Sequence, residues 1–249
     1  MIHADLHTQP VALDREQHRL LRLRRDVDDQ ARFAQLNSCF VLAGEFAEAC
    51  KDYPLLWVRA GSDDKGEPQV APIAVFGLTA RSNLCIDGGR WRTRHVPMML
   101  RAYPFATARS GEDTWVMCYD ASSPRFSLTA GEPLFAADGT PAALTREVQQ
   151  QLEAMEADVE RTRLLGRELL QRDLLREMRF QVDLPGAEKL DVDGFFIVDA
   201  QRFAALADAD VLALHRAGFL PLIDAHLISL PNMRLLAQWH LDRLGAAAV

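Results

Sequence analysis

The stretch from residue 52 to residue 120 contains most of the strand-like apolar runs of this chain, and turn signals separate them. The runs cover residues 55–60, 70–78, 83–87 and 115–119. A polar turn, GSDDKGEP, separates the first two runs, and Gly88-Gly89 follows the third. Most connections are too short for the crossover helix that two parallel strands require. The stretch therefore predicts an antiparallel sheet.

One long helix is predicted after this stretch, opening at Thr140-Pro141 and ending near Leu174. Thr140 can cap a helix, and Pro141 suits the first helical position. Its apolar residues recur every three or four positions, as on one buried face: Leu144, Val148, Leu152, Met155, Val159, Leu165 and Leu169. Gly166 costs about 1 kcal/mol relative to alanine inside a helix. This glycine indicates either a kink or the close approach of another backbone.

The rest of the chain alternates short elements. Residues 31–52 are predicted to be helical in two pieces, and period-two alternation over 178–184 and 190–192 predicts a hairpin turning at Pro185-Gly186. Two short helices capped by Asp199 and Asp208 should follow, and then a helical segment over 223–244, broken at Pro231. We therefore expect an α+β fold in a single domain (1–249): a mostly antiparallel sheet flanked by one long helix and a C-terminal helical segment.

Composition excludes several classes of protein. The chain has 35 acidic and 28 basic residues and a net charge of −7, which argues against a general nucleic-acid binder. Apolar runs reach only about eight residues, against the ~20 of a membrane-spanning helix, so no membrane span is expected. The four cysteines form no C-x-x-C pair, so we expect buried, reduced thiols in a cytoplasmic protein. We also expect Trp115 and Trp239 to lie in the core.

An arginine-rich window is the strongest local anomaly. Between Gly88 and Gly111 there are five arginines and no acidic residue: Arg90, Arg92, Arg94, Arg101 and Arg109. Such a window can hold a carboxylate or phosphate through guanidinium contacts, with Trp91 and Tyr103 beside it. The same arginines can instead pair with acids of the long helix or stack on aromatic rings. The sequence leaves both interpretations open.

Histidines near the C-terminus raise the question of a metal site. Two histidines with a carboxylate can bind iron(II), but Asp224 and His226 lie two apart in a predicted helix and so diverge. Ser229 shares a helical face with His226, yet no G-x-S-x-G elbow surrounds it, so a local hydroxyl hydrogen bond is expected. We expect no catalytic residue, metal or cofactor. The candidate ligand- or partner-binding residues are Trp91, Arg94, Arg101, Tyr103 and His226.

Several short phrases together resemble one family. They are Glu45-Phe46, Tyr53-Pro54, Gly77 with Asn83-Leu84, Gly89-x-Trp91, then Pro97, Arg101 and Tyr103-Pro104-Phe105. Later phrases are Gly131-x-x-Leu134-Phe135, Gly139, Gly194-Phe195, Val198-Asp199, Gly218-x-Leu220, Ala225-His226-Leu227 and Ser229-Leu230. In this order and spacing the chain resembles the SapC family over nearly its whole length. Cys85 stands where an aromatic residue is usual, and Asp224 where tyrosine is common.

The resemblance implies a context but no reaction, because the family has no established activity. Its members are often encoded beside TonB-dependent receptors, tryptophan-halogenase-like flavoproteins and cupin-like hydroxylases. This context implies accessory work in a TonB-receptor-linked uptake or modification pathway. Together with the arginine-rich window and the lack of a catalytic constellation, it favours a binding protein, without catalysis of its own, that recognises a partner protein or peptide. One alternative is an enzyme acting on a peptide or small anionic substrate, with Arg101 holding the anion and His226 as acid–base group or metal ligand. Another is a small-anion sensor domain.

Overall fold

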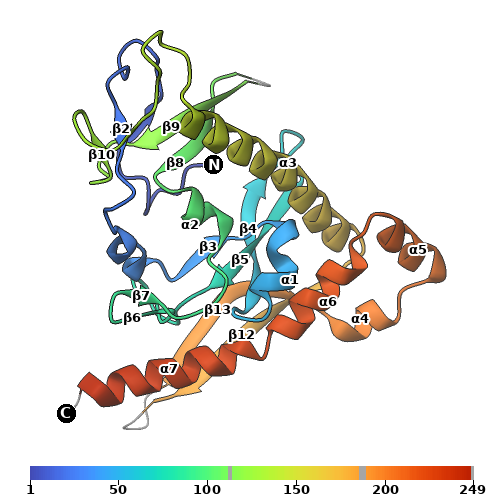
Figure 1. Cartoon of the computed structure of the whole chain (residues 1–249). Helices are drawn as coiled ribbons and strands as arrows, with labels where there is room; N and C mark the ends of the chain where they lie inside the picture. Colours follow the sequence, from blue (N-terminus) through green and yellow to red (C-terminus); the bar gives the residue numbers. More distant parts are fainter. Residues whose placement is uncertain (112–113, 185–188, 248–249) are drawn as a thin grey trace. The chain divides into compact units, whose positions relative to one another are not determined.

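The structure is a computed structural model that describes residues 1–111, 114–184 and 189–247 (Figure 1). Its contacts gather into two compact units. Unit 1 consists of Met1–Ala34 and Met98–Ala157, and unit 2 of Gln35–Pro97 and Asp158–Val249. The chain changes unit after Ala34, after Pro97 and within the long helix α3 (Ala143–Gln171). The expectation of a single domain remains a prediction.

Unit 1 contains two small antiparallel sheets. The first has the order β1-β9-β8, with β1 at Pro10–Ala12, β9 at Trp115–Asp120 and β8 at Phe105–Arg109. The second has the order β10-β2-β11, with β10 at Phe126–Ser127, β2 at Arg22–Leu23 and β11 at Glu132–Pro133. Phe126 packs its ring edge-on against Phe105 and Tyr119, at centroid distances of 5.6 and 4.8 Å. These aromatic contacts join the two sheets.

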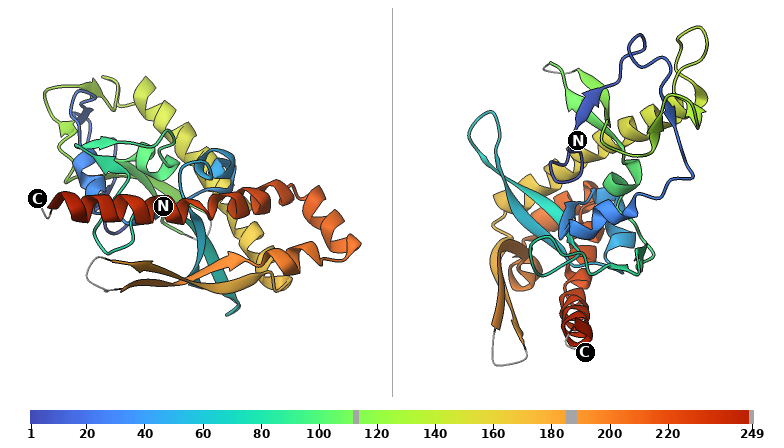
Figure 2. Two further views of the ribbon diagram at one scale, coloured as in Figure 1. Left: turned by 90° about the horizontal axis from the view of Figure 1, so that it is seen from below. Right: turned by 90° about the vertical axis from the view of Figure 1, so that its left-hand side faces the viewer.

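Unit 2 is built on a five-stranded antiparallel sheet with the order β12-β13-β4-β5-β3. Its strands are β3 (Ser38–Phe40), β4 (Leu55–Ser62), β5 (Pro68–Val75), β12 (Leu175–Asp183) and β13 (Lys189–Val198). Strand β13 pairs with β4 only at Phe196 and Trp57, so the β12–β13 hairpin runs beyond the sheet (Figure 2). A separate small hairpin, β6 (Ile86–Asp87) with β7 (Arg90–Trp91), turns at Gly88-Gly89, where both φ angles are positive. Antiparallel pairing and the α+β class are confirmed.

The remaining helices complete both units. They are η1 (Gln30–Gln35) and α2 (Met98–Ala102), then η2 (Ala43–Glu45), α1 (Phe46–Ala49), α4 (Ala200–Ala204), α5 (Asp208–Arg216), α6 (Leu220–Ser229) and α7 (Asn232–Ala247). The carboxylate of Asp199 accepts hydrogen bonds from the backbone N–H groups of Gln201 and Arg202, as its capping role predicts. No described helix alone is long and apolar enough to cross a membrane. Asp208–Arg216 and Leu220–Gly245, bent by 93°, would meet that test only as a pair.

Gly166 marks where α3 approaches the sheet of unit 2. A Cβ at this position would lie 2.9 Å from the carbonyl oxygen of Val70 and 3.4 Å from the Trp57 ring. Real Cβ atoms are not found that close to a backbone oxygen. The prediction of close backbone approach is therefore confirmed, and the glycine lets the helix lie against β5.

Some local predictions were wrong because tertiary pairing overrode local signals. Residues 38–40, expected to be helical, form strand β3, which pairs with β5. The long helix starts at Ala143, since Pro141 is held in a bridge with Phe135 and the hydroxyl of Thr140 donates to Asp138. Asp208 is the first residue of α5, and the cap is Ala207. The turn expected at Pro185-Gly186 lies outside the described residues.

Candidate functional site

The arginine-rich window is divided between the two units. Trp91 and Arg94 belong to unit 2, whereas Arg101 and Tyr103 belong to unit 1. All five arginines of the window are exposed. Only Arg92 has a carboxylate partner among the described residues, because its Nη2 lies 2.9 Å from Asp87. Arg92 also stacks on Trp239, and Arg109 stacks on Trp115. The structural interpretation thus holds for these two arginines.

Trp115 corrects a prediction about the core. Its side chain is 40% exposed at the start of β9, where Arg109 covers one face of the ring. Trp239 is only half-buried on α7. Both tryptophans therefore serve as stacking surfaces for arginines and are not fully buried in a core.

Arg101 and Tyr103 line one small pocket in unit 1, with a volume of about 170 Å³. Two further arginines, Arg25 and Arg125, line the same pocket, and Glu147 is its only acidic residue. The other lining residues are Leu23, Ala102, Pro104, Phe105, Leu144, Val148 and Gln151. We call this cavity the arginine pocket. Three guanidinium groups around one concavity form an electropositive site.

The arginines of this pocket differ in how firmly the fold engages them. Arg125 donates from Nη1 to the carbonyl of Tyr103 at 3.0 Å, which fixes its position. Arg25 pairs with Glu132 at 2.7 Å, although both side chains are more than half exposed. The side chain of Arg101 makes no hydrogen bond or ion pair with any residue that the structure describes. Its guanidinium is therefore the one most available to a ligand.

A buried hydrogen-bond network supports the pocket through Tyr103. The Tyr103 hydroxyl donates to Oδ2 of Asp120 at 2.8 Å, and Asp120 is fully buried. Arg32 approaches the same oxygen at 3.4 Å and donates to Ser122 Oγ at 3.0 Å. Burial raises the pKa of Asp120, but hydrogen bonds from Gln9, Tyr103 and Ser122 outweigh it, so the net shift is downward. The carboxylate is thus ionised and positions the Tyr103 segment.

A second polar cluster lies in unit 2 around Tyr53 and Trp91. The Nε1–H of Trp91 donates to the Tyr53 hydroxyl at 2.8 Å, and Thr93 Oγ1 lies 2.5 Å from that hydroxyl. Tyr53 in turn donates to the carbonyl oxygen of His95. Burial raises the pKa of Tyr53 well above its usual range, so the phenol stays protonated. Of the predicted residues, only Trp91 belongs to this cluster.

Glu45 and His95 extend this cluster, although no pattern in the sequence predicts a role for His95. His95 Nε2 lies 3.0 Å from Oε1 of Glu45, while the backbone N–H of His95 donates to Asp52 at 2.7 Å. The side chain of Glu45 is 3% exposed and that of His95 is 14% exposed. Fifty residues separate the pair in the chain, so no local motif announces it. Arg94, one residue before His95, is exposed and forms no hydrogen bond or ion pair with the described residues.

His226 has a place in the interior of unit 2. Its Nε2 accepts a hydrogen bond from the backbone N–H of Val198 at 3.0 Å, and only 1% of the residue is exposed. Burial lowers its pKa to about 4, so the ring is neutral. Ser229 donates to the carbonyl of His226 at 2.6 Å and accepts from the N–H of Leu55 at 2.9 Å. The predicted local hydrogen bond of Ser229 is confirmed, and both side chains tie α6 to the sheet.

Metal ligands and reactive thiols receive little support within the described residues. No group of three or more His, Cys, Asp or Glu side chains there is arranged to hold a metal ion. All four cysteines are free and buried, as expected. Burial raises the pKa of Cys85 to about 12 and that of Cys39 well above its usual value, so these thiols are protonated and unreactive.

Comparison with known proteins supplies the family and nothing finer. Neither a search of curated proteins nor a search of solved structures gave a significant match. The family model described as SapC matches residues 13–236, which include the segments that form the arginine pocket and the cluster around Tyr53. Because this match covers most of the chain, the protein belongs to the SapC family.

Proposed function

We propose that this protein is a binding protein that recognises a carboxylate group of a peptide or protein partner in the arginine pocket. The observation that carries the proposal is the exposed guanidinium of Arg101, which lines a concave site and has no partner among the described residues. Arginine holds carboxylates through two parallel N–H···O bonds, and such charge-assisted bonds are stronger than neutral ones. Arg125, fixed by the Tyr103 carbonyl, supplies a second, pre-positioned donor group.

The size of the pocket limits what it can hold. A volume of about 170 Å³ accommodates one amino-acid side chain or one chain end and not a folded surface. Leu23, Leu144 and Val148 provide apolar walls beside the guanidinium groups. Three arginines stand among the lining residues, so a negatively charged anchor residue fits this pocket better than an apolar one. The proposed ligand is therefore a single carboxylate-bearing anchor of a longer partner.

The test compares labelled tripeptides that end in a free carboxylate with the same tripeptides ending in an amide, using fluorescence anisotropy. We expect the free carboxylates to bind more tightly, and Arg101→Ala to weaken them about tenfold or more, since a hydrogen bond to a charged group contributes about 1.5–3 kcal/mol. Arg109→Ala is the matched control, because Arg109 is exposed in the same window but stacks on Trp115 outside the pocket. Equal binding of acids and amides, or no effect of Arg101→Ala, would refute the proposal.

The biological partner is proposed from the family context. The resemblance implies proteins of a TonB-receptor-linked uptake or modification pathway, and pull-down with the neighbouring gene products tests this directly. Capture of a neighbouring gene product would support the proposed partner class if Arg101→Ala abolishes the capture and Arg109→Ala leaves it intact. A small-anion sensor would use the same pocket. That function would be favoured if free glutarate binds tightly and the tripeptides bind with no higher affinity than glutarate.

A further inference from the structure

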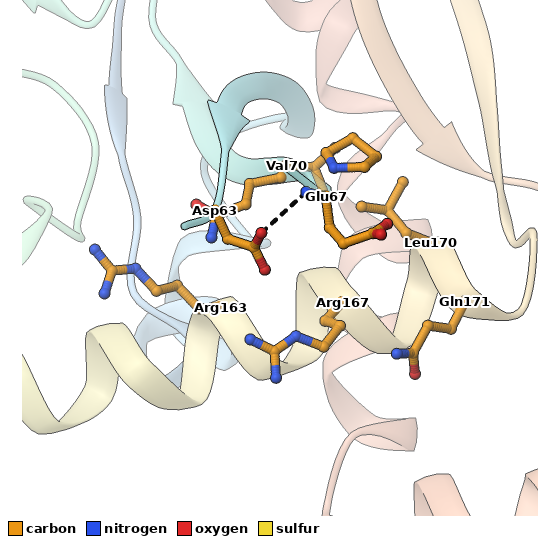
Figure 3. A pocket seen from close by; sticks show the side chains of 9 residues that line it. Asp63, Glu67, Val70, Arg163, Arg167, Leu170 and Gln171 are labelled. Atoms are coloured by element: carbon orange, nitrogen blue, oxygen red, sulfur yellow. Dashed lines mark hydrogen bonds between the residues drawn. The ribbon is translucent and has the colours of Figure 1, made fainter. Parts of the chain in front are cut away.

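A second pocket, independent of the first, lies in unit 2 between the β4–β5 hairpin and the C-terminal half of α3 (Figure 3). Its volume is about 330 Å³. The lining residues are Asp63, Glu67, Pro68, Gln69 and Val70 from the hairpin and Arg163, Arg167, Leu170 and Gln171 from the helix. The pocket therefore has one acidic wall and one basic wall.

Local structure explains why these side chains share a pocket. Positions 163, 167, 170 and 171 lie on one face of an α-helix, because residues three and four apart are neighbours. Gly166 allows that helix to lie against Val70, which places this face beside the hairpin. On the opposite wall, Asp63 Oδ1 accepts hydrogen bonds from the backbone N–H groups of Lys65 and Glu67, both at 2.9 Å. The hairpin turn is thus ordered by one of its own acidic residues.

The charged side chains of the two walls line one pocket, and no ion pair between described residues connects one wall to the other. Arg163 is engaged by Glu160 on its own helix at 2.5 Å. The side chains of Arg167 and Glu67 form no hydrogen bond or ion pair with any described residue. The pKa of Asp63 is lowered, first by the N–H groups of Glu67 and Lys65 and further by the charge of Arg167, so this carboxylate is ionised. The guanidinium of Arg167, the carboxylate of Glu67 and the second carboxylate oxygen of Asp63 are therefore open to a ligand.

We propose that this pocket binds a small zwitterion with an aliphatic side chain, either a free amino acid or a dipeptide. Its carboxylate binds the guanidinium of Arg167, and its ammonium binds the carboxylates of Glu67 and Asp63. Its side chain lies on Val70, Pro68 and Leu170. A ligand that carries both charges completes both walls at once, which a simple anion or cation cannot do. The volume is within the range of small-molecule sites.

The test is calorimetric titration of the full chain with leucine, glycyl-leucine, N-acetylleucine and leucinamide. Leucine or glycyl-leucine should bind, and the comparison of these two decides between free amino acid and dipeptide. Acetylation removes the ammonium charge and amidation the carboxylate charge, so each blocked ligand should bind about tenfold more weakly or worse. The proposal is wrong if neither zwitterion binds, or if blocking either end leaves the affinity unchanged.

Two variants that each remove one charge assign each charge to its wall. Arg167→Gln should bind leucine and leucinamide equally, while it still discriminates against N-acetylleucine. Glu67→Gln should reduce the discrimination against N-acetylleucine and keep that against leucinamide. Arg161→Ala, on an exposed α3 residue outside the pocket, is the control and should bind as the unmodified chain does. The assignment is wrong if either variant loses the discrimination against both N-acetylleucine and leucinamide. It is also wrong if Arg161→Ala changes binding as much as Arg167→Gln or Glu67→Gln does. Arg101 lies in the other pocket, so Arg101→Ala should leave the binding of these zwitterions unchanged. The two proposals can therefore fail independently of each other.

Discussion

The Nε2 of His95 lies 3.0 Å from Oε1 of Glu45, a carboxylate whose side chain is only 3% exposed. The other carboxylate oxygen of Glu45 accepts the backbone N–H of Leu42 at 3.1 Å. The pair thus connects the start of η2 to the segment that contains Trp91 and Arg94. Since removal of one partner leaves a carboxylate buried without its neighbour, this contact should contribute to the stability of unit 2.

We expect His95→Ala to lower the free energy of unfolding by about 2–3 kcal/mol, because a buried charged group loses a hydrogen-bonding partner. Urea denaturation measures the change. The same substitution in a Glu45→Gln background should cost less, since no buried charge remains there. Arg94→Ala, at the neighbouring exposed position, is the control and should change stability by no more than about 0.5 kcal/mol. Equal costs for His95→Ala in both backgrounds would contradict the role of the Glu45–His95 contact.

Acid should destabilise the fold through His226. Its pKa is about 4 when folded and 6.5 as the ordinary value, so between these pH values the unfolded chain binds a proton that the folded chain does not. The stabilisation is complete above pH 6.5 and is lost progressively as the pH falls from 6.5 through 4. A shift of this size corresponds to about 3 kcal/mol.

Urea denaturation of the unmodified chain and of His226→Gln over this pH range isolates the effect. His3 and His7, whose pKa values burial also lowers, are present in both proteins and cancel in the difference. We expect His226→Gln to be less stable at pH 7.5 but to have a flatter profile between pH 6.5 and pH 4. Parallel profiles for the two proteins would show that His226 is not the titrating group.

Gly166→Ala sets helix propensity against packing. Propensity alone favours alanine by about 1 kcal/mol, but the added Cβ would lie 2.9 Å from the carbonyl oxygen of Val70, which cannot rotate away. We therefore expect a net loss of about 1–3 kcal/mol, typical of overpacking, measured by thermal or urea unfolding. Gly245→Ala on α7 is the control. Apart from its own helix and chain neighbours, no described atom lies within 4 Å of its added Cβ, so that variant should be neutral or slightly more stable. A stabilised Gly166→Ala variant would show that the helix does not approach the strand this closely.

Local patterns in the sequence were sufficient where one residue acts on its own backbone. Asp199 caps α4, the helical segment near the C-terminus breaks between Ser229 and Asn232 around Pro231, and Gly88-Gly89 turns the β6–β7 hairpin. Each of these features depends on φ, ψ or hydrogen-bonding constraints within a few residues. Local patterns are insufficient where distant residues pair: residues 38–40 lie in a stretch that predicts a helix, but their pairing with β5 makes them a strand.

The sequence by itself determined the family, the α+β class, the antiparallel strands and the arginine-rich window, because those follow from residue order and periodicity. Only the tertiary structure decided which arginines share a site. It divided the window between two units, joined Arg101 with Arg25 and Arg125 around one pocket, and paired Glu45 with His95 across fifty residues. The physical reason is that a binding site depends on distances between side chains, and chain folding sets those distances independently of separation along the sequence.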